Sequence, residues 1–208
     1  MVNNLRNQKK LMNKNSRDFS LEKAAIDYID VLFKDNADGH DVDHTMRVFN
    51  LALEIAKDYP ESNLFLISMS ALLHDVDDHK LFQTENNQHA REFLKTHNVD
   101  EENIEKVCQI IDEISFSHNQ NNKPSSLEAM IVQDADRLDA MGAIGVARTF
   151  AYGGKNNRPL SSSIQHFHDK LLLLKDMMNT ETGKKMAEDR HQFLVDFLKE
   201  YEKETRED

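Results

Sequence analysis

Apolar residues recur every three or four positions along most of the chain, which is the spacing of one buried face of an α-helix. The first such face, from Leu21 to Leu32, predicts a helix over 20–34 with Ser20 as its N-cap. The same spacing predicts further helices over 43–58, 62–75, 85–97, 101–115, 126–139, 143–150, 161–178 and 182–204.

Polar and glycine-containing stretches separate these helices. The segments 35–39, 116–125 and 153–159 are predicted loops, the last because it begins with Gly153-Gly154 and ends at Pro159. No segment alternates apolar and polar residues between turn residues, as a half-buried strand does. The sequence therefore predicts an all-α fold, a compact multi-helix domain of short packed helices.

The length of 208 residues suits a single domain. We expect a flexible N-terminal segment over 1–19 and one domain over 20–208, with a core over 20–155 and C-terminal helices over 160–204. The run Leu171 to Leu174 is too apolar to be wholly exposed, so we expect these last helices to pack on the domain or on a second copy in a homodimer.

The helix predicted over 62–75 ends in a dense group of ligand-type side chains. Its apolar run leads directly into His-Asp-Val-Asp-Asp-His-Lys at positions 74–80. Carboxylates beside a core are costly unless they are paired or bound to a cation. Imidazole and carboxylate together are good ligands for a divalent metal, so this stretch predicts a metal site that takes further ligands from elsewhere in the chain.

Two other stretches offer such ligands: Gly-His-Asp-Val-Asp-His-Thr-Met-Arg-Val at 39–48 and Gln-Asp-Ala-Asp-Arg-Leu-Asp at 133–139. The three stretches give the order His…His-Asp…Asp. This pattern resembles the HD-domain metal-dependent phosphohydrolase superfamily over roughly residues 20–155. The motifs His-Asp-Val-Asp-Asp-His-Lys, Asp-Ala-Asp-Arg-Leu-Asp-Ala-Met-Gly-Ala and Arg-Thr-Phe-Ala-Tyr-Gly-Gly look like the small bacterial members that act on nucleotides, a pyrophosphohydrolase-like group.

The resemblance implies four metal ligands, which are His44, His74, Asp75 and Asp136. Two imidazoles and two carboxylates leave room for water around a six-coordinate ion, which favours Mn²⁺ and keeps Mg²⁺, Co²⁺, Ni²⁺, Fe²⁺ and Zn²⁺ open. Each position has rivals. His40 competes with His44 but has the wrong spacing to Arg47-Val48, and Asp134 and Asp139 compete with Asp136.

Four further residues are candidates for the chemistry around the ion. Asp78 follows His74 by four residues, one helical turn if the helix continues, and is expected to orient or deprotonate the attacking water. Lys80, Arg148 and His118 are expected to contact the substrate. Lys80 and Arg148 also have plainer readings: a surface lysine for Lys80, and for Arg148 a salt bridge to Asp136 or Asp139.

Composition limits the partners. A formal net charge of −11 argues against a duplex nucleic acid, and no apolar run reaches the length of a membrane span. The one cysteine, Cys108, lies in an apolar helical stripe and is expected to be a buried small residue. Because a single cysteine cannot form a disulfide within the chain, a cytoplasmic location is expected.

The leading hypothesis is a metal-dependent phosphohydrolase that acts on a small anionic nucleotide or phosphate ester. Attack on the α-phosphorus of a nucleoside triphosphate would release pyrophosphate. The alternatives are a non-catalytic metal- or nucleotide-binding regulator, and a binuclear HD-type phosphodiesterase or oxygenase in which His89 and His118 hold a second metal.

Overall fold

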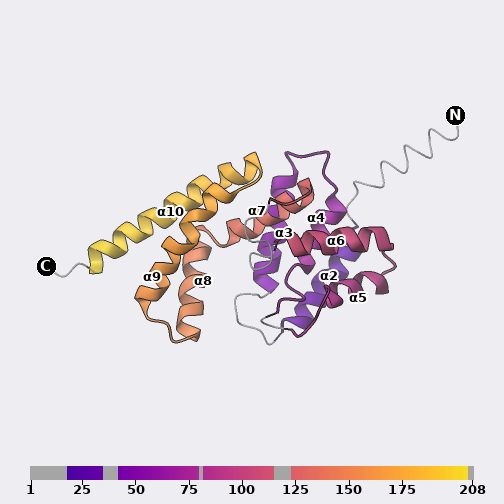
Figure 1. Cartoon of the computed structure of the whole chain (residues 1–208), viewed down its shortest axis with the longest axis horizontal. Helices are drawn as coiled ribbons and strands as arrows, with labels where there is room; N and C mark the ends of the chain where they lie inside the picture. The colour runs from indigo at the N-terminus through magenta and orange to yellow at the C-terminus, as the bar shows by residue number, and fades with distance from the viewer. Residues whose placement is uncertain (1–17, 35–41, 80–81, 115–122, 206–208) are drawn as a thin grey trace. The chain divides into compact units, whose positions relative to one another are not determined.

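The computed structural model describes residues 18–34, 42–79, 82–114 and 123–205. Over these residues the chain is all-α, with no strand (Figure 1), and the predicted fold class is confirmed. The helices are α2 (Phe19–Leu32), α3 (Val42–Ala56), α4 (Leu64–Leu73), α5 (Gln88–Thr96), α6 (Glu101–Ile114), α7 (Leu127–Asp139), α8 (Gly142–Lys155), α9 (Leu160–Asp169), the 3-10 helix η1 (Leu171–Met177) and α10 (Glu181–Thr205).

The chain forms two compact units, Met1–Gln133 and Asp134–Asp208, and the division falls inside α7. The helices of the first unit lie within about three residues of their predicted bounds, which is the ordinary uncertainty of helix ends. The expectation of one domain over 20–208 stays a prediction.

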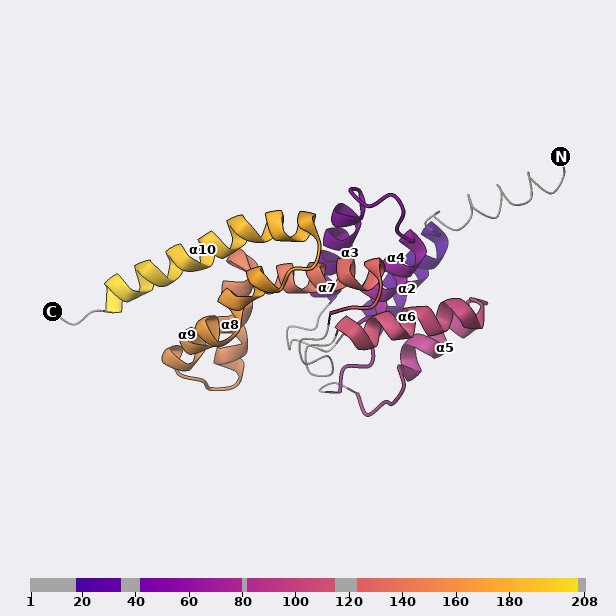
Figure 2. The same cartoon turned by 45° about the horizontal axis from the view of Figure 1, so that its top comes forward.

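α4 is the central helix of the first unit. It packs against α2, α3 and α6, and every residue from Leu66 to Leu73 is buried. Figures 1 and 2 show α3 beside α4 from both directions. Because α4 is enclosed, its two polar residues at 68 and 70 are also buried; Ser68 donates a 2.7 Å hydrogen bond to Glu22, a buried carboxylate on α2.

The first helix starts earlier than predicted. Its N-cap is Asp18 and not Ser20: the Asp18 carboxylate accepts hydrogen bonds from the backbone N–H groups of Ser20 and Leu21, each at 3.1 Å. The hydroxyl of Ser20 also donates to this carboxylate, at 2.8 Å; this bond is the largest cause of a pKa of Asp18 below its ordinary value, and the two backbone bonds lower the pKa further. A carboxylate satisfies two amide donors at once, which explains why the acid two residues upstream takes the capping position.

In the second unit, α8 runs through Gly153-Gly154 to Lys155, so the predicted loop over 153–159 begins three residues later than expected. The reason for a glycine at 153 is close packing of α8 on α9. A Cβ atom at Gly153 would lie 2.5 Å from the hydroxyl oxygen of Ser163 on α9. The missing side chain lets the two helices approach each other, and it does not mark a break.

The predicted helix over 161–178 is two elements. α9 ends at Asp169; at its C-cap residue Lys170 φ is −139° and ψ is −58°, and the chain continues as the 3-10 helix η1. Three residues per turn place Leu171 and Leu174 on one side, and both are buried, while Leu173 is 52% exposed. The expectation that the leucine run is not wholly exposed is confirmed.

α10 is fixed at its start by a buried carboxylate of α7. Asp134 is fully buried and accepts four hydrogen bonds: from the backbone and side-chain amides of Asn179 (2.8 and 2.9 Å) and from the backbone and hydroxyl of Thr180 (2.8 and 2.7 Å). Burial raises the pKa of Asp134, and the bonds from Asn179 and Thr180 oppose that rise. Thr180 in turn accepts from the Gly183 N–H at 2.9 Å, as an N-cap does.

Among the described residues, no helix has both the length and the apolar character needed to cross a membrane.

We predict that Asp134→Ala destabilises the protein by at least about 3 kcal/mol, because it leaves several buried donors without an acceptor. Chemical denaturation followed by circular dichroism measures the loss. Gly183→Ala should also destabilise, since its Cβ atom would lie 2.5 Å from Asp134 Oδ2. Asp189→Ala, an exposed acid on α10, is the matched control. Equal stability of Asp134→Ala and Asp189→Ala would contradict the anchoring role.

Candidate metal centre

Two helices of the first unit bring the predicted site together. His44 lies in the first turn of α3 and is only 2% exposed. His74 is the C-cap residue of α4, still in the right-handed helical region with φ −63° and ψ −29°, and Asp75 follows it. Since α4 is buried along its length, its end places both residues next to the core.

Three donor atoms converge there. His44 Nε2 and His74 Nε2 lie 3.3 Å apart, and the Asp75 Oδ2 atom lies 3.4 Å from the first and 3.3 Å from the second. The three side chains are nearly enclosed, with the Asp75 side chain 10% exposed. Within the part of the chain that the structure describes, this is the one group of at least three His, Cys, Asp or Glu residues with metal-site geometry.

The hydrogen bonding of His74 prepares it as a ligand. Its Nδ1 atom donates to the Ala71 carbonyl at 2.9 Å, and because a carbonyl can only accept, the proton lies on Nδ1. Nε2 of a neutral ring then carries a lone pair that faces the Asp75 carboxylate. Such lone pairs repel each other unless a cation lies between them, and a ring nitrogen bonded to a backbone carbonyl is the usual support of a metal-bound histidine.

The spacing also fits a divalent ion. An ion with bonds of about 2.1 Å holds neighbouring ligands about 3.0 Å apart in an octahedral shell and about 3.4 Å apart in a tetrahedral one. The observed separations of 3.3 and 3.4 Å fall in this range. The residues present therefore fit a metal of nitrogen and oxygen preference, and the donor set alone leaves its identity open.

Beyond His74 the chain does not continue as a helix. The residues 74–78, named the ligand turn, contain two hydrogen bonds of turn type, from Val76 N to Leu73 O (3.3 Å) and from Asp78 N to Asp75 O (3.1 Å). Asp78 is half-buried in this turn. The helix does not continue to Asp78, as its spacing from His74 assumed. A turn links Asp78 to Asp75 instead.

The remaining predicted ligand, Asp136, lies half-buried on the part of α7 that belongs to the second unit. Its role as fourth ligand stays a prediction. Its two rivals have other partners: Asp134 accepts four hydrogen bonds at the start of α10, and Asp139 forms an ion pair with Arg148. Asp139 was the alternative partner expected for Arg148 from the sequence; a substrate contact by Arg148 stays a prediction.

Three other sequence candidates, His40, Lys80 and His118, lie outside the described residues. His89 is within them, at the start of α5, and its ring turns back to the ligand turn: Nδ1 donates to the Val76 carbonyl at 2.8 Å. The side chain of Asp77, in the ligand turn, is 8% exposed and accepts from the backbone N–H groups of His89 and Ala90, each at 3.0 Å. The sequence pattern missed both contacts.

The family model of the HD domain matches residues 41–141 of this chain. A Bacillus subtilis protein, the uncharacterized protein YpgQ, is 38% identical over 185 residues, which cover 85% of this chain and 90% of YpgQ.

Solved structures of related proteins superpose on most of this chain. The crystal structure of Bacillus subtilis YpgQ in complex with ADP superposes with a TM-score of 0.78 at 34% identity, over 89% of this chain and 95% of that one. An HD-superfamily hydrolase from Bacillus thuringiensis has a TM-score of 0.72 at 38% identity, over 88% and 95% of the two chains.

We predict that the purified protein binds one divalent ion per chain and that His74→Ala abolishes this binding, because it removes one of three enclosed donors. Elemental analysis after dialysis against Mn²⁺ measures the content, with Asp136→Ala as the test of the fourth ligand. His97→Ala is the control, since its ring makes the same kind of bond to a carbonyl, at 2.8 Å to Phe93. Wild-type metal content in His74→Ala would rule out this site.

Proposed function

Because this chain belongs to the HD-domain family, we propose that it is a metal-dependent phosphohydrolase that acts on a small nucleotide. The observation that carries the proposal is the enclosed triangle of His44, His74 and Asp75 donor atoms, 3.3 to 3.4 Å apart. An enclosed site of this composition binds a divalent cation, and such a cation suits chemistry on an anionic substrate.

The nucleotide as substrate class draws support from the relatives. YpgQ, which covers most of this chain at 34% identity, was crystallised with ADP. A nucleoside diphosphate shares its nucleoside and its α- and β-phosphates with a triphosphate. A net charge of −11 would repel such a ligand, so a metal and local basic side chains are needed to hold it.

Four residues would hold the ion: His44, His74, Asp75 and Asp136. For Asp136 the support is its place in Ala-Asp-Arg-Leu, the last part of the His…His-Asp…Asp order. When bound, the ion supplies a Lewis acid that polarises a phosphoryl oxygen and lowers the pKa of water.

Asp78 serves the water side of the reaction. It lies in the ligand turn, three residues after Asp75, with its backbone N–H bonded to the Asp75 carbonyl. We assign its carboxylate the task of orienting the attacking water and accepting its proton. Lys80, Arg148 and His118 serve the phosphate side, where positive charge and hydrogen-bond donors offset the charge that develops in the transition state. Attack at the α-phosphorus of a nucleoside triphosphate releases the monophosphate and pyrophosphate.

We predict that the Mn²⁺-loaded protein releases pyrophosphate from at least one nucleoside triphosphate, and that Asp78→Asn lowers its turnover about 10²- to 10⁴-fold. The substitution keeps the size of the side chain and removes the charge that accepts a proton. Assays that read phosphate and pyrophosphate separately identify the bond that is cleaved. Asp30→Asn, an exposed acid on α2, is the matched control.

Two outcomes would count against the proposal. Full turnover by Asp78→Asn at unchanged metal content would make Asp78 a solvated acid. No turnover of any nucleotide with Mn²⁺, Co²⁺, Ni²⁺ or Mg²⁺ would favour a non-catalytic binding protein.

A further inference from the structure

The ligand turn carries His74, Asp75 and Asp78, and no helical ladder of bonds holds its backbone. α4 ends at Leu73, and beyond it the N–H groups of Val76, Asp78 and Phe82 bond to the carbonyls of Leu73, Asp75 and Asp78 at 3.3, 3.1 and 2.9 Å. A helix would fix each residue through a regular ladder of bonds. A turn without that ladder depends on contacts from outside for a defined geometry.

Three hydrogen bonds from the start of α5 supply such contacts. Asp77 Oδ1 accepts from the His89 N–H at 3.0 Å, and Asp77 Oδ2 accepts from the Ala90 N–H at 3.0 Å. The His89 ring donates from Nδ1 to the Val76 carbonyl at 2.8 Å. All three bonds join the same short turn to the first turn of one helix.

Asp77 caps the N-terminus of α5, although a capping residue normally lies immediately before its helix in the chain. The cap residue Asn87 has a left-handed backbone, φ 54° and ψ 46°, and makes no capping bond with its side chain. Its amide instead donates to the Asp112 carboxylate (2.8 Å) and the Cys108 carbonyl (3.4 Å) on α6. The first N–H groups of α5 therefore take their acceptor from a residue twelve positions upstream, where a carboxylate is also favoured by the helix dipole.

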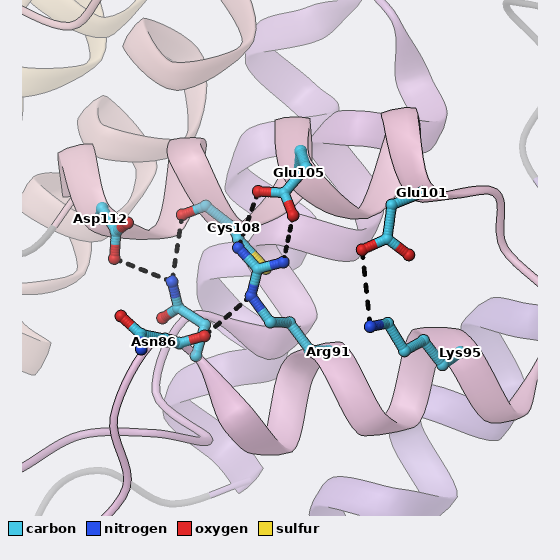
Figure 3. Close-up of polar contacts among 8 residues, drawn as sticks. Asn86, Arg91, Lys95, Glu101, Glu105, Cys108 and Asp112 are labelled. Carbon is cyan, nitrogen blue, oxygen red and sulfur yellow. Dashed lines mark hydrogen bonds and ion pairs between the residues drawn. The ribbon is translucent and has the colours of Figure 1, made fainter.

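α5 is itself fixed on α6, so it is a firm support for the turn. Arg91 forms a two-pronged ion pair with Glu105 and also donates to the Asn86 carbonyl at 2.9 Å, as Figure 3 shows. Farther along the two helices, Lys95 Nζ lies 3.5 Å from Glu101 Oε1. α6 packs on α4, the helix from which the ligand turn leaves. The chain thus closes a ring of contacts from α4 through the turn, α5 and α6 back to α4.

We propose that Asp77 and His89 are positioning residues of the metal centre: they hold the ligand turn against α5, and His89 acts through its Nδ1 atom. The effect on metal binding rests on the proposed function. The effect on the turn itself does not, because the three bonds join atoms of the turn directly to atoms of α5. The His89 ring is further fixed by Phe82, whose ring meets it edge-on at 5.1 Å between centroids.

The two ring nitrogens of His89 can be tested separately. An asparagine side chain places an N–H donor where Nδ1 stands, and a glutamine side chain places one where Nε2 stands. Positioning through Nδ1 predicts that His89→Asn behaves like wild type and that His89→Gln behaves like His89→Ala. A role of Nε2 as a metal ligand or substrate contact would make His89→Asn as poor as His89→Ala.

The experiment combines hydrogen exchange of the peptide containing residues 74–78, followed by mass spectrometry on metal-free protein, with titration of Mn²⁺. We expect His89→Ala and His89→Gln to exchange about 3- to 10-fold faster in this peptide, as the loss of one hydrogen bond allows. Both should weaken Mn²⁺ binding about 10- to 100-fold, while His89→Asn stays near wild type. His97→Ala, at the other end of α5, should change neither value.

Asp77→Ala adds a second test, with Asp100→Ala as its control, because Asp100 accepts the Asn103 N–H at 3.0 Å at the start of α6 and does not touch the turn. If Asp77→Ala does not fold, the His89 series still decides. Unchanged exchange of the turn in His89→Ala overturns the proposal. If the wild type binds no Mn²⁺, the proposed function fails, and the exchange rates alone then decide whether Asp77 and His89 hold the turn.

Discussion

Two imidazole nitrogens and a carboxylate oxygen lie within 3.4 Å of one another at the buried end of α4, and the rest of the first unit serves to keep them there. Unpaired, such a group would be costly to enclose, because carboxylate and imidazole lone pairs repel and lose their water. Coordination of a divalent cation by the three donor atoms would offset that cost. The enclosure of α4 by α2, α3 and α6 then has a purpose beyond stability, since it fixes where the helix ends.

The geometry of such a centre depends on the residues that hold the ligands in place as much as on the ligands themselves. His74 is oriented by the carbonyl of Ala71, one turn earlier in α4. The turn after Asp75 has no helical ladder and takes its support from α5 through Asp77 and His89. A rigid centre is useful for phosphoryl chemistry, where positions off by a fraction of an ångström lower the rate.

The sequence was sufficient for most of the helices and for singling out His44, His74 and Asp75, whose donor atoms the fold brings together, because helical spacing and the His…His-Asp order are local patterns. It failed where a residue acts across the chain. Asp77 looks like an exposed acid beside a motif until α5 places two N–H groups on it. Gly153 looks like a loop until the hydroxyl of Ser163 is seen to occupy the place of its side chain. In both cases the deciding neighbour is ten or more residues away and follows no period that could be read from the chain.

The central claim is that His44, His74 and Asp75 hold one divalent ion, and anomalous diffraction from crystals grown with Mn²⁺ tests it most directly. The account predicts one strong anomalous peak within about 2.3 Å of His44 Nε2, His74 Nε2 and a carboxylate oxygen of Asp75. Crystals with the same three side chains in place but no peak among them, at a Mn²⁺ concentration that fills other sites, would contradict it.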